Sequence, residues 1–479
     1  MVDLRLVREA DGPILEVTGT GSAPEWVRLV GPRVTVTAQP SGESGSWQAR
    51  LPLRASRWGG ASLPLPSGRY AVTVEGAGTV AGEQPITQYG MLRAGLHDGA
   101  VEIGPPIDPA YDSGEGQEAL ERRYTARREQ LEDAVFFESS AGRRVGGDPL
   151  AIDREIAHRR PSTVRYWSVR DLSVAVPEGA IAIVEGSPQW WRARGVSRLL
   201  IVDDWLRRRF ARRDGQHVLQ TWHGTPIEQV GLRRPGLDWR RWVAIIDESR
   251  RWNVLLAQSP YAEEVLRSSH PFRRRPIWVE GSPRNDALVN GTGPNVRGLL
   301  GIGATERVLL YAPARRRRDE PAPGVLDAER LARAAGAVVL TREPVPIPRP
   351  APSAGPRVVD VAGFPDTTQL LGAADALVTD FAPAMFDFSV TGKPMYFFVP
   401  DLEHRRGTLG GFSIDLAASA PGPVVRTQDA LERAILEDDP SAHALAYEEW
   451  RATFNAKDDG HAAERVVARL IDEGLLSSP

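Results

Sequence analysis

One stretch of the sequence decides the fold: HVLQTWHGTP, residues 217–226. Its first four residues form a short run that is typical of a buried strand. His223 follows the end of that run, Gly224 permits a tight turn, and Pro226 fits the first turn of a helix. Strand, turn and helix in this order predict a parallel α/β unit with His223 at the carboxyl end of its strand.

Short apolar runs alternate with helical segments on both sides of this stretch. The runs before it are residues 134–137, 180–184 and 198–202, and those after residue 300 are 308–311, 337–340, 357–360, 376–379 and 395–398. This alternation is typical of parallel sheets that are covered by helices on both faces. Two such blocks, joined near residues 290–305, predict two α/β lobes with a cleft between them. Ligands of parallel sheets bind beyond the carboxyl ends of the strands.

The first 110 residues have a different pattern. Alternating segments such as 2–6, 34–37 and 70–74 are separated by clusters of Gly, Pro and Ser. They predict a small antiparallel sandwich, in which no motif carries chemistry, so we favour a passive structural domain over a docking module. Charged helix formers from Glu115 to Glu132 predict a helix. We divide the chain into a β-sandwich-like domain (1–112), a linker helix (113–133) and two α/β lobes (134–296 and 297–479).

The composition excludes several classes of protein. At 479 residues the chain is too long for one hydrophobic core, and its net charge of −3 gives no reason to expect nucleic acid as a partner. The absence of cysteine excludes disulfides, thiolate nucleophiles and zinc–thiolate sites. Residues 1–7 do not resemble a signal peptide, and no run approaches the roughly 20 apolar residues of a membrane span. We expect a cytoplasmic protein whose membrane contact is at most peripheral.

His223 is the leading candidate for chemistry. Histidine is the side chain whose unperturbed pKa suits proton transfer near neutral pH. A structural role stays open at this point, because a single loop histidine is more often structural than catalytic.

Two further polar segments follow predicted strands. Arg284, Asn285 and Asp286 come after the strand 277–279 and supply a guanidinium, an amide and a carboxylate on one loop. Four arginines, residues 315–318, follow the strand 308–311. The planar fork of arginine suits phosphate oxygens, although a solvated basic loop is the competing interpretation.

The segment 378–388 is expected to form a strand, a turn and a helix. Pro383 fits the first turn of that helix, whose N-terminus would offer a phosphate site. Asp380 is a candidate for this site, and it also fits the role of an N-terminal helix cap. Lys393 follows, just before the apolar run 395–398.

Taken together, these motifs resemble the CDP-glycerol glycerophosphotransferase family, which includes teichoic-acid primases and polymerases. The resemblance extends from about Val135 to the C-terminus. It is carried by these ordered motifs: Phe137-Glu138-Ser139 with Asp148-Pro149, Trp222-His223-Gly224-Thr225-Pro226 with Gly231, Pro283-Arg284-Asn285-Asp286, Tyr311-Ala312-Pro313 with Arg316, Thr379-Asp380-Phe381, Met385-Phe386-Asp387-Phe388 and Pro400-Asp401-Leu402.

The resemblance implies two Rossmann-like lobes of the GT-B glycosyltransferase type, with no cofactor or metal required. The first lobe would be the acceptor side and the second the nucleotide-donor side. The implied reaction moves glycerol phosphate from CDP-glycerol, or another polyol phosphate from its CDP-polyol, to a lipid-linked polyol-phosphate or glycan acceptor. It takes place at the inner membrane face in the synthesis of teichoic-acid or capsule-like polymers.

The resemblance also implies roles for individual residues. His223 would be the catalytic base, taking the proton of the acceptor hydroxyl as it attacks the β-phosphorus of the donor and CMP leaves. The residues expected to bind the donor or its phosphates are Arg284, Asn285, Asp286, Arg316, Asp380 and Lys393. The residues expected to support the loop are Gly224, Thr225, Pro226 and Asp387.

Three positions depart from the family pattern. Ala314 stands where the family usually has Thr, Glu343 appears in place of a second functional His, and Ala382-Pro383 replaces a Ser pair. Each change removes a donor to the diphosphate, which Arg342 and the arginines at 315–318 could replace. Two alternatives therefore stay open: a glycosyltransferase with another nucleotide-sugar donor, and a non-catalytic relative.

Overall fold

The computed structural model describes residues 2–42, 45–76, 80–126, 129–272, 275–293, 295–314, 326–342, 357–402, 414–437 and 439–477. The chain forms two compact units. The first contains residues 1–145, 164–197 and 213–215, and the second contains residues 146–163, 198–212 and 216–479. The division at residues 112, 133 and 296 that the sequence suggests stays a prediction.

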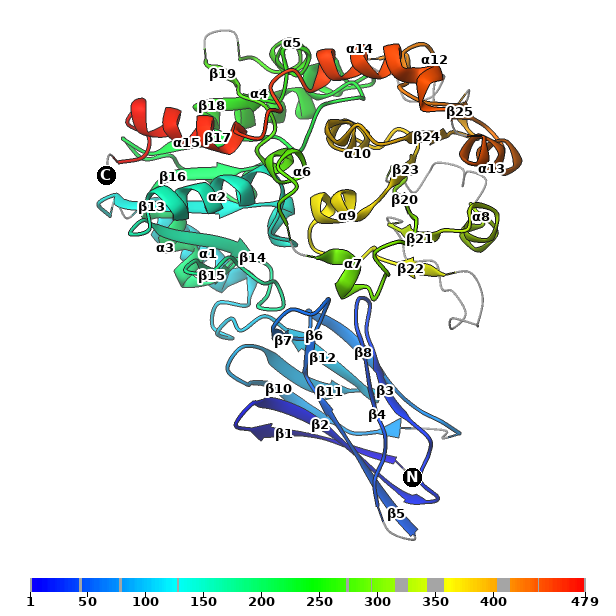
Figure 1. Cartoon of the computed structure of the whole chain (residues 1–479). Helices are drawn as coiled ribbons and strands as arrows, with labels where there is room; N and C mark the ends of the chain where they lie inside the picture. Colours follow the sequence, from blue (N-terminus) through cyan, green and yellow to red (C-terminus); the bar gives the residue numbers. More distant parts are fainter. Residues whose placement is uncertain are drawn as a thin grey trace. The chain divides into compact units, whose positions relative to one another are not determined.

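The N-terminal part of the first unit is a β-sandwich (Figure 1). Its pairing is antiparallel, apart from a short parallel contact of β1 with β9. One sheet has the order β5 (Gly45–Pro52), β2 (Gly12–Gly21), β1 (Val2–Glu9), β9 (Val80–Ala81); the other has the order β10 (Gln84–Gln88), β11 (Arg93–His97), β12 (Ala100–Gly104), β8 (Gly68–Val74), β3 (Val27–Val30), β4 (Thr35–Ala38). A hairpin of β6 (Arg54–Ser56) and β7 (Ser62–Pro64) completes it. The sandwich predicted from the alternating segments is confirmed.

Alternation of side chains explains why these strands form a sandwich. Along β1 and β2 every second residue is buried, and Leu4, Leu15 and Val17 of these strands share one core with Leu29 and Val101 of the other sheet. Strand side chains alternate between faces, so this pattern buries one face of each sheet.

The rest of the first unit is parallel α/β. It contains α1 (Gly114–Ala126), α3 (Pro188–Val196) and the parallel strands β13 (Glu132–Glu138), β14 (Val164–Val169) and β15 (Ile181–Val184). The sandwich is tied to this part, since Ser67 N–H donates to Asp171 at 2.9 Å and Arg57 donates to the Ser173 carbonyl at 2.8 Å. The helix expected over 115–132 ends at Ala126, and β13 begins within the expected range.

The second unit contains two groups of parallel strands. The first group is β16 (Ser197–Val202), β17 (His217–Gln220), β18 (Val254–Ala257) and β19 (Ile277–Val279). The second has the order β22 (Val358–Asp360), β21 (Val338–Thr341), β20 (Val308–Tyr311), β23 (Ala376–Thr379), β24 (Met395–Phe398), β25 (Val424–Val425). The parallel α/β class predicted from the sequence is confirmed.

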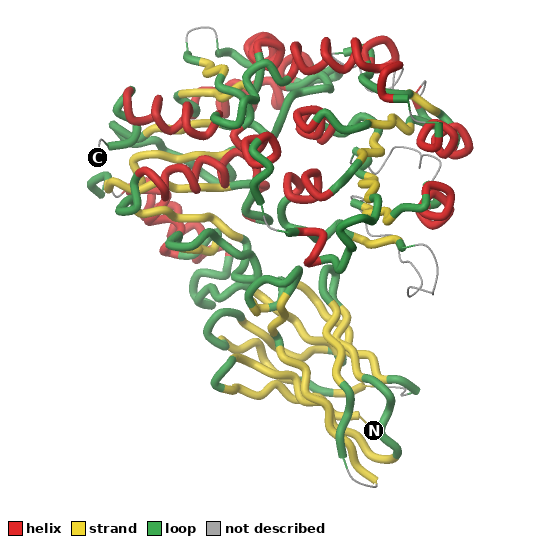
Figure 2. The backbone as a smooth tube through the Cα atoms, viewed as in Figure 1, coloured by secondary structure: helices red, strands yellow, loops and turns green. Residues whose placement is uncertain are grey.

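Helices cover both faces of the second strand group, as Figures 1 and 2 show. Helices α8 (Ala328–Ala335) and α13 (Gln428–Leu436) lie on one face, and their apolar side chains share a core with β20, β21 and β24. Helices α9 (Thr367–Ala373) and α10 (Ala384–Phe388) lie on the other. Strands β20, β21, β23 and β24 are therefore buried on both faces and consist almost entirely of apolar residues.

The C-terminal helices return to the first strand group of this unit. Helix α14 (Ala444–Phe454) packs against α5 (Pro260–Ser269), and α15 (Ala462–Asp472) packs against α2 (Gly147–Arg159). Among the described residues of the unit, the remaining helices are α4 (Trp239–Arg251), α6 (Asp286–Val289), α7 (Val296–Leu299), α12 (Leu416–Ser419) and the short 3₁₀ turns η2 (Gly231–Arg233), η3 (Pro283–Asn285), η4 (Ser389–Thr391) and η5 (Pro440–His443). Within the described residues, no helix has both the length and the apolar character needed to cross a membrane.

Candidate functional site

His223 lies in the loop that follows the carboxyl end of β17. The residue before it, Trp222, is buried and has a φ of 58°, a left-handed conformation that is strained for a bulky side chain. The Trp222 N–H donates to Gln220 Oε1 at 2.9 Å, and Gln220 Nε2 donates to the Asp204 carbonyl at 3.0 Å. A buried side chain thus holds the turn in the conformation that presents His223.

The ring of Trp222 sets the orientation of His223. The two rings are stacked, with centroids 4.9 Å apart and an interplanar angle of 19°. Trp222 in turn meets Trp252 and His270 edge to face. His270 is buried, and burial lowers its pKa to about 4. The aromatic side chains that hold the imidazole of His223 in place are therefore uncharged at physiological pH.

The contacts of His223 favour one neutral tautomer. Its Nδ1 lies 3.3 Å from the backbone carbonyl oxygen of Asp203, which can only accept a hydrogen bond, so Nδ1 carries the proton. The pKa of His223 is lowered from its ordinary value because loss of solvation outweighs the opposing effects of the Asp203 carbonyl and Asp204. Although protein surrounds the ring, the residue keeps an exposed surface. A neutral imidazole with Nε2 as the acceptor is the arrangement of a general base.

The loop after His223 differs from the sequence expectation in one respect. No helix begins at Pro226, because the described residues 221–230 contain none and the chain continues irregularly to η2. The carbonyl oxygen of Pro226 accepts a hydrogen bond from the Tyr261 hydroxyl at 3.3 Å, which holds the loop against α5. Thr225 and Pro226 are buried. Their role in supporting the loop stays a prediction.

Gly224 brings the histidine loop against Arg284. Its φ is 124°, and a Cβ at this position would lie 2.8 Å from Nη2 of Arg284 and 3.8 Å from Cβ of Pro383. Both the backbone conformation and the space around it therefore require glycine.

Replacing Gly224 by alanine is expected to destabilise the protein by about 1–3 kcal/mol and to lower turnover about a hundredfold. The reason is that the new methyl group must displace the Arg284 side chain or the histidine loop. Gly236→Ala is the matched control, because Gly236 has a φ of 68° and nothing within 4 Å of the added carbon. Equal effects of the two substitutions on turnover and thermal unfolding would show that the close approach to Arg284 is unimportant.

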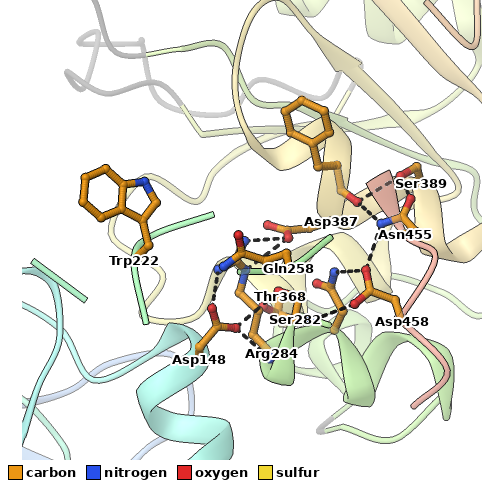
Figure 3. Close-up of polar contacts among 12 residues, drawn as sticks. Asp148, Trp222, Gln258, Ser282, Arg284, Thr368, Asp387, Ser389, Asn455 and Asp458 are labelled. Carbon is orange, nitrogen blue, oxygen red and sulfur yellow. Dashed lines mark hydrogen bonds and ion pairs between the residues drawn. The ribbon is translucent and has the colours of Figure 1, made fainter. Parts of the chain in front are cut away.

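The guanidinium of Arg284 is held by two carboxylates (Figure 3). Its Nη1 lies 3.1 Å from Asp148 Oδ2, and its Nη2 and Nε donate to Asp387 Oδ1 at 2.7 and 3.1 Å. Asp148 also accepts from the Arg284 backbone N–H at 3.1 Å and from the Ser282 hydroxyl at 3.3 Å. The group ties α2, η3 and α10 together, and we call Asp148, Arg284 and Asp387 the arginine clasp.

Burial makes the arginine clasp an interdependent set of charges. Burial disfavours the charge of Arg284, but Asp148 and Asp387 outweigh it and raise the pKa of Arg284. Burial raises the pKa of Asp148, and the charge and N–H of Arg284 oppose that shift. Since most of the Arg284 guanidinium is occupied by carboxylates, its contacts favour a positioning role over the direct phosphate binding predicted from the sequence.

Asn285 belongs to a second buried polar group. Its Nδ2 donates to Asp458 Oδ2 at 3.1 Å, and Asp458 also accepts from the Ser282 N–H at 2.7 Å and from Asn455 Nδ2 at 2.9 Å. Burial raises the pKa of Asp458 to about 6. Asn455 in turn donates to the Phe386 carbonyl at 2.8 Å. This group fastens the loop after α14 to η3 and α10.

Asp286 and Lys393 bind backbone groups at helix ends. The Asp286 carboxylate accepts from the N–H groups of Ala462 and Ala463, at 2.9 and 2.8 Å, and so caps α15. Lys393 Nζ donates to the Ala374 carbonyl at 2.6 Å, just beyond the end of α9. Burial raises the pKa of Asp286 and lowers that of Lys393. Both residues have structural partners, and donor binding stays a prediction for each.

The loops after β20 and β23 are joined by Asp380. Its Oδ1 accepts from the Ala314 N–H at 2.6 Å, and the Thr379 hydroxyl donates to the Ala312 carbonyl at 2.8 Å. Asp380 therefore connects two loops, while Pro383 is the residue at the N-cap of α10. Arg316 and Glu343 lie outside the described residues. Arg342 donates to the carbonyls of residues 361 and 364, at 3.1 and 3.0 Å.

A cleft of 1240 Å³ lies beside the arginine clasp in the second unit. Gly147, Arg284, Asp286 and Lys393 line it, but His223 and Asp380 do not. The predicted site residues therefore fall into two sets, which Arg284 connects because it contacts Gly224 and also lines the cleft.

Sequence reasoning did not assign roles to Asp148, Asp203 or Asp458. Asp148 was visible only as part of a family motif, while Asp203 acts through its backbone carbonyl, for which side-chain identity gives no signal. Asp458 lies 176 residues from Ser282, with no local pattern to connect them.

The fold and the site define the class of protein. This is a parallel α/β protein with an N-terminal β-sandwich and a neutral histidine presented at the carboxyl end of a strand, as in enzymes that use acid–base chemistry. The family described as CDP-glycerol:poly(glycerophosphate) glycerophosphotransferase matches residues 122–472. The chain belongs to this family, so the family resemblance and the transferase class predicted from the sequence are confirmed.

Curated relatives agree with this assignment. The chain is 28% identical over 358 residues to the teichoic acid poly(glycerol phosphate) polymerase of Bacillus subtilis (strain 168), covering 70% of this chain and 48% of the polymerase. It is 27% identical over 369 residues to the teichoic acid glycerol-phosphate transferase of Staphylococcus aureus (strain NCTC 8325 / PS 47), covering 70% of this chain and 92% of the transferase. The chain thus spans about half the length of the first relative and most of the second.

Solved structures share the fold. The wall teichoic acid polymerase TagF aligns with a TM-score of 0.68 and 22% identity, over 75% of this chain and 94% of that one. A variant of the same polymerase soaked with CDPG aligns with a TM-score of 0.67 and 21% identity, over the same shares of the two chains.

Proposed function

We propose that the chain transfers glycerol phosphate, or another polyol phosphate, from a CDP-polyol to a lipid-linked acceptor in the synthesis of a teichoic-acid or capsule-like polymer. The observation that carries this proposal is the neutral His223, stacked on Trp222 and held through Nδ1 by the Asp203 carbonyl. Membership of the glycerophosphotransferase family supplies the reaction class.

In the proposed reaction, Nε2 of His223 takes the proton from a hydroxyl of the acceptor. The hydroxyl oxygen forms a bond to the β-phosphorus of the donor, and the bond from that phosphorus to the oxygen shared with the α-phosphate breaks. CMP leaves with the electron pair of the broken bond. Positioning and charge stabilisation account for most of the rate gain in phosphoryl transfer, so the rigid support of the histidine ring is central.

We place the donor beside the loops that follow β20 and β23, in a GT-B arrangement of two lobes. The support for this is that Asp380 fixes the backbone of both loops at the carboxyl ends of parallel strands, where ligands of such sheets bind. Pro383 is close to Gly224, which brings this region near the histidine loop.

The pH dependence of the reaction follows from the protonation of His223. A base must be neutral, so kcat/KM is high above the pKa of His223 and falls as the pH drops through it. Because burial lowers this pKa, we expect kcat/KM to fall to half of its maximum at a pH below 6.5. Tryptophan fluorescence at each pH controls for unfolding. A half-maximal point above pH 6.5 would contradict the assignment of His223 as the base.

We also propose that helix α4 touches the membrane during catalysis. It exposes Trp239, Trp242 and Val243, whose exposed fractions are 71, 49 and 41%, and Arg240 and Arg241 are exposed beside them. Tryptophan and arginine on one exposed surface are typical of helices that lie at an anionic lipid interface. A lipid-linked acceptor requires such a contact.

The double substitution Trp239→Ser with Trp242→Ser is expected to lower binding to vesicles of anionic phospholipid at least tenfold in a flotation assay. The apolar area that inserts between headgroups is removed, while the charge is unchanged. Leu436→Ser with Leu445→Ser is the matched control, because both leucines are exposed on other helices. If both double variants float like the unsubstituted protein, α4 is not the membrane contact.

A further inference from the structure

The cleft beside the arginine clasp is lined by side chains of both charges. All four carboxylates that line it have partners inside the protein: Glu155 and Glu464 bind Arg159, Asp286 caps α15, and Asp366 accepts from the Thr368 N–H. Arg159 compensates one of the two glutamate charges, while Asp286 and Asp366 bind neutral backbone N–H groups at helix ends and keep their negative charge.

Two arginines on different walls of the cleft form no ion pair within the described chain. Arg154 lies on α2 and Arg451 on α14, and both residues are exposed. The Nζ of Lys393 binds a carbonyl oxygen, which leaves its positive charge uncompensated by that contact. The two arginines therefore offer contacts for two separate anionic groups of one ligand.

The other lining groups indicate what kind of anion fits. Among the described lining residues there is no Phe, Tyr or Trp, and His461 is the one aromatic side chain on which a nucleobase could stack. The polar side chains of Asn290, Thr292, Thr368, Gln369 and Thr391 supply hydroxyl and amide groups instead. These groups suit hydroxyl-bearing carbon chains, and at 1240 Å³ the cleft is far larger than one phosphate requires.

The cleft extends to the residues that hold the catalytic histidine. Gly147 lines it, and a Cβ there would lie 3.8 Å from Oδ2 of Asp203, the residue whose carbonyl binds His223. Arg284 lines it as well and contacts Gly224. A chain lying in the cleft would therefore have one end near the histidine loop.

We propose that this cleft binds the phosphodiester-linked polyol chain of the acceptor, with Arg154 and Arg451 contacting its phosphates and the growing end directed toward His223. This inference rests on the proposed function, since it names the part of the acceptor that the transferase would hold. It predicts that affinity rises with the number of phosphodiesters.

The test is a titration of the whole protein with synthetic glycerol-phosphate oligomers of increasing length, in the absence of donor. We expect the longest oligomer to bind at least tenfold more tightly than the dimer. Arg154→Gln with Arg451→Gln should reduce that gain to less than threefold, and Arg154→Lys with Arg451→Lys should restore most of it. Arg123→Gln with Arg433→Gln, exposed arginines on α1 and α13, is the matched control and should keep the full gain.

Two results would overturn the proposal: an affinity that does not depend on length, or a length dependence that the Arg154 and Arg451 substitutions leave intact. Binding of inorganic phosphate, added at the same total charge as the oligomer, shows whether the cleft binds any anion or prefers a chain. If phosphate binds as tightly as the oligomer, the proposal is also wrong. Release of CMP from CDP-glycerol is measured separately. If CMP is released while the oligomers fail to bind, the cleft proposal is wrong and the proposed function stands.

Discussion

Substitution of His223 by alanine is expected to lower the rate of polyol phosphate transfer by about 10²–10⁴, the usual contribution of a positioned general base. The substitution removes the group that, in the proposed reaction, takes the proton from the acceptor hydroxyl. The fold should survive, because the residue is exposed and the hydrogen bond that it loses is the one to the Asp203 carbonyl. The measurement is CMP release from CDP-glycerol in the presence of a glycerol-phosphate acceptor.

The control for this substitution is His158→Ala, because His158 is an exposed histidine on α2 with no part in the site. It should leave the rate unchanged. Thermal unfolding and donor binding of the His223 variant should match those of the unsubstituted protein. If the His223→Ala protein turns over within a few-fold of normal, the base has been wrongly assigned.

Loss of the arginine clasp is expected to have the largest effect on stability. Arg284→Met leaves the fully buried Asp148 carboxylate without its ion-pair partner, which costs about 3–5 kcal/mol in the free energy of unfolding. Asp148→Asn should also destabilise, since the Arg284 charge then keeps only Asp387. Urea denaturation followed by tryptophan fluorescence measures both.

A double-substitution cycle separates the interaction from the individual losses. The loss of stability in the protein with both Arg284→Met and Asp148→Asn should be smaller than the sum of the losses in the two single variants. The reason is that Asp148→Asn removes the buried carboxylate that Arg284→Met alone would leave without its partner. Arg333→Met is the control: Arg333 pairs with Glu329 at 3.9 Å on the exposed side of α8, and the substitution should cost less than about 1 kcal/mol. Strict additivity in the cycle would mean that the clasp contributes no mutual stabilisation.

Most strands of the parallel sheets could be predicted from the sequence because they are short apolar runs. Runs such as Val308–Tyr311 and Ala376–Thr379 are continuous apolar segments, and the structure has them as β20 and β23. Strand β14 was missed because Arg165 and Ser168 interrupt its apolar pattern, although both are buried. Strand β18 was missed because it follows α4 with almost no turn between them.

The site was only partly predictable, for a physical reason. The position of His223 follows from local signals, a strand end followed by glycine and proline. The contacts of Arg284 do not follow from local signals. A guanidinium binds a carboxylate as well as a phosphate, and Asp148 lies 136 residues away in the sequence. The same holds for Asp286, whose carboxylate caps a helix that begins 176 residues later.

The most direct test of the central claim is a single reaction of the purified protein with CDP-glycerol and a short glycerol-phosphate acceptor, analysed by mass spectrometry. The proposed function predicts an acceptor extended by glycerol phosphate units, with one CMP released for each unit added. Absence of CMP and of extended acceptor, together with turnover or tight binding of a different nucleotide sugar, would contradict it.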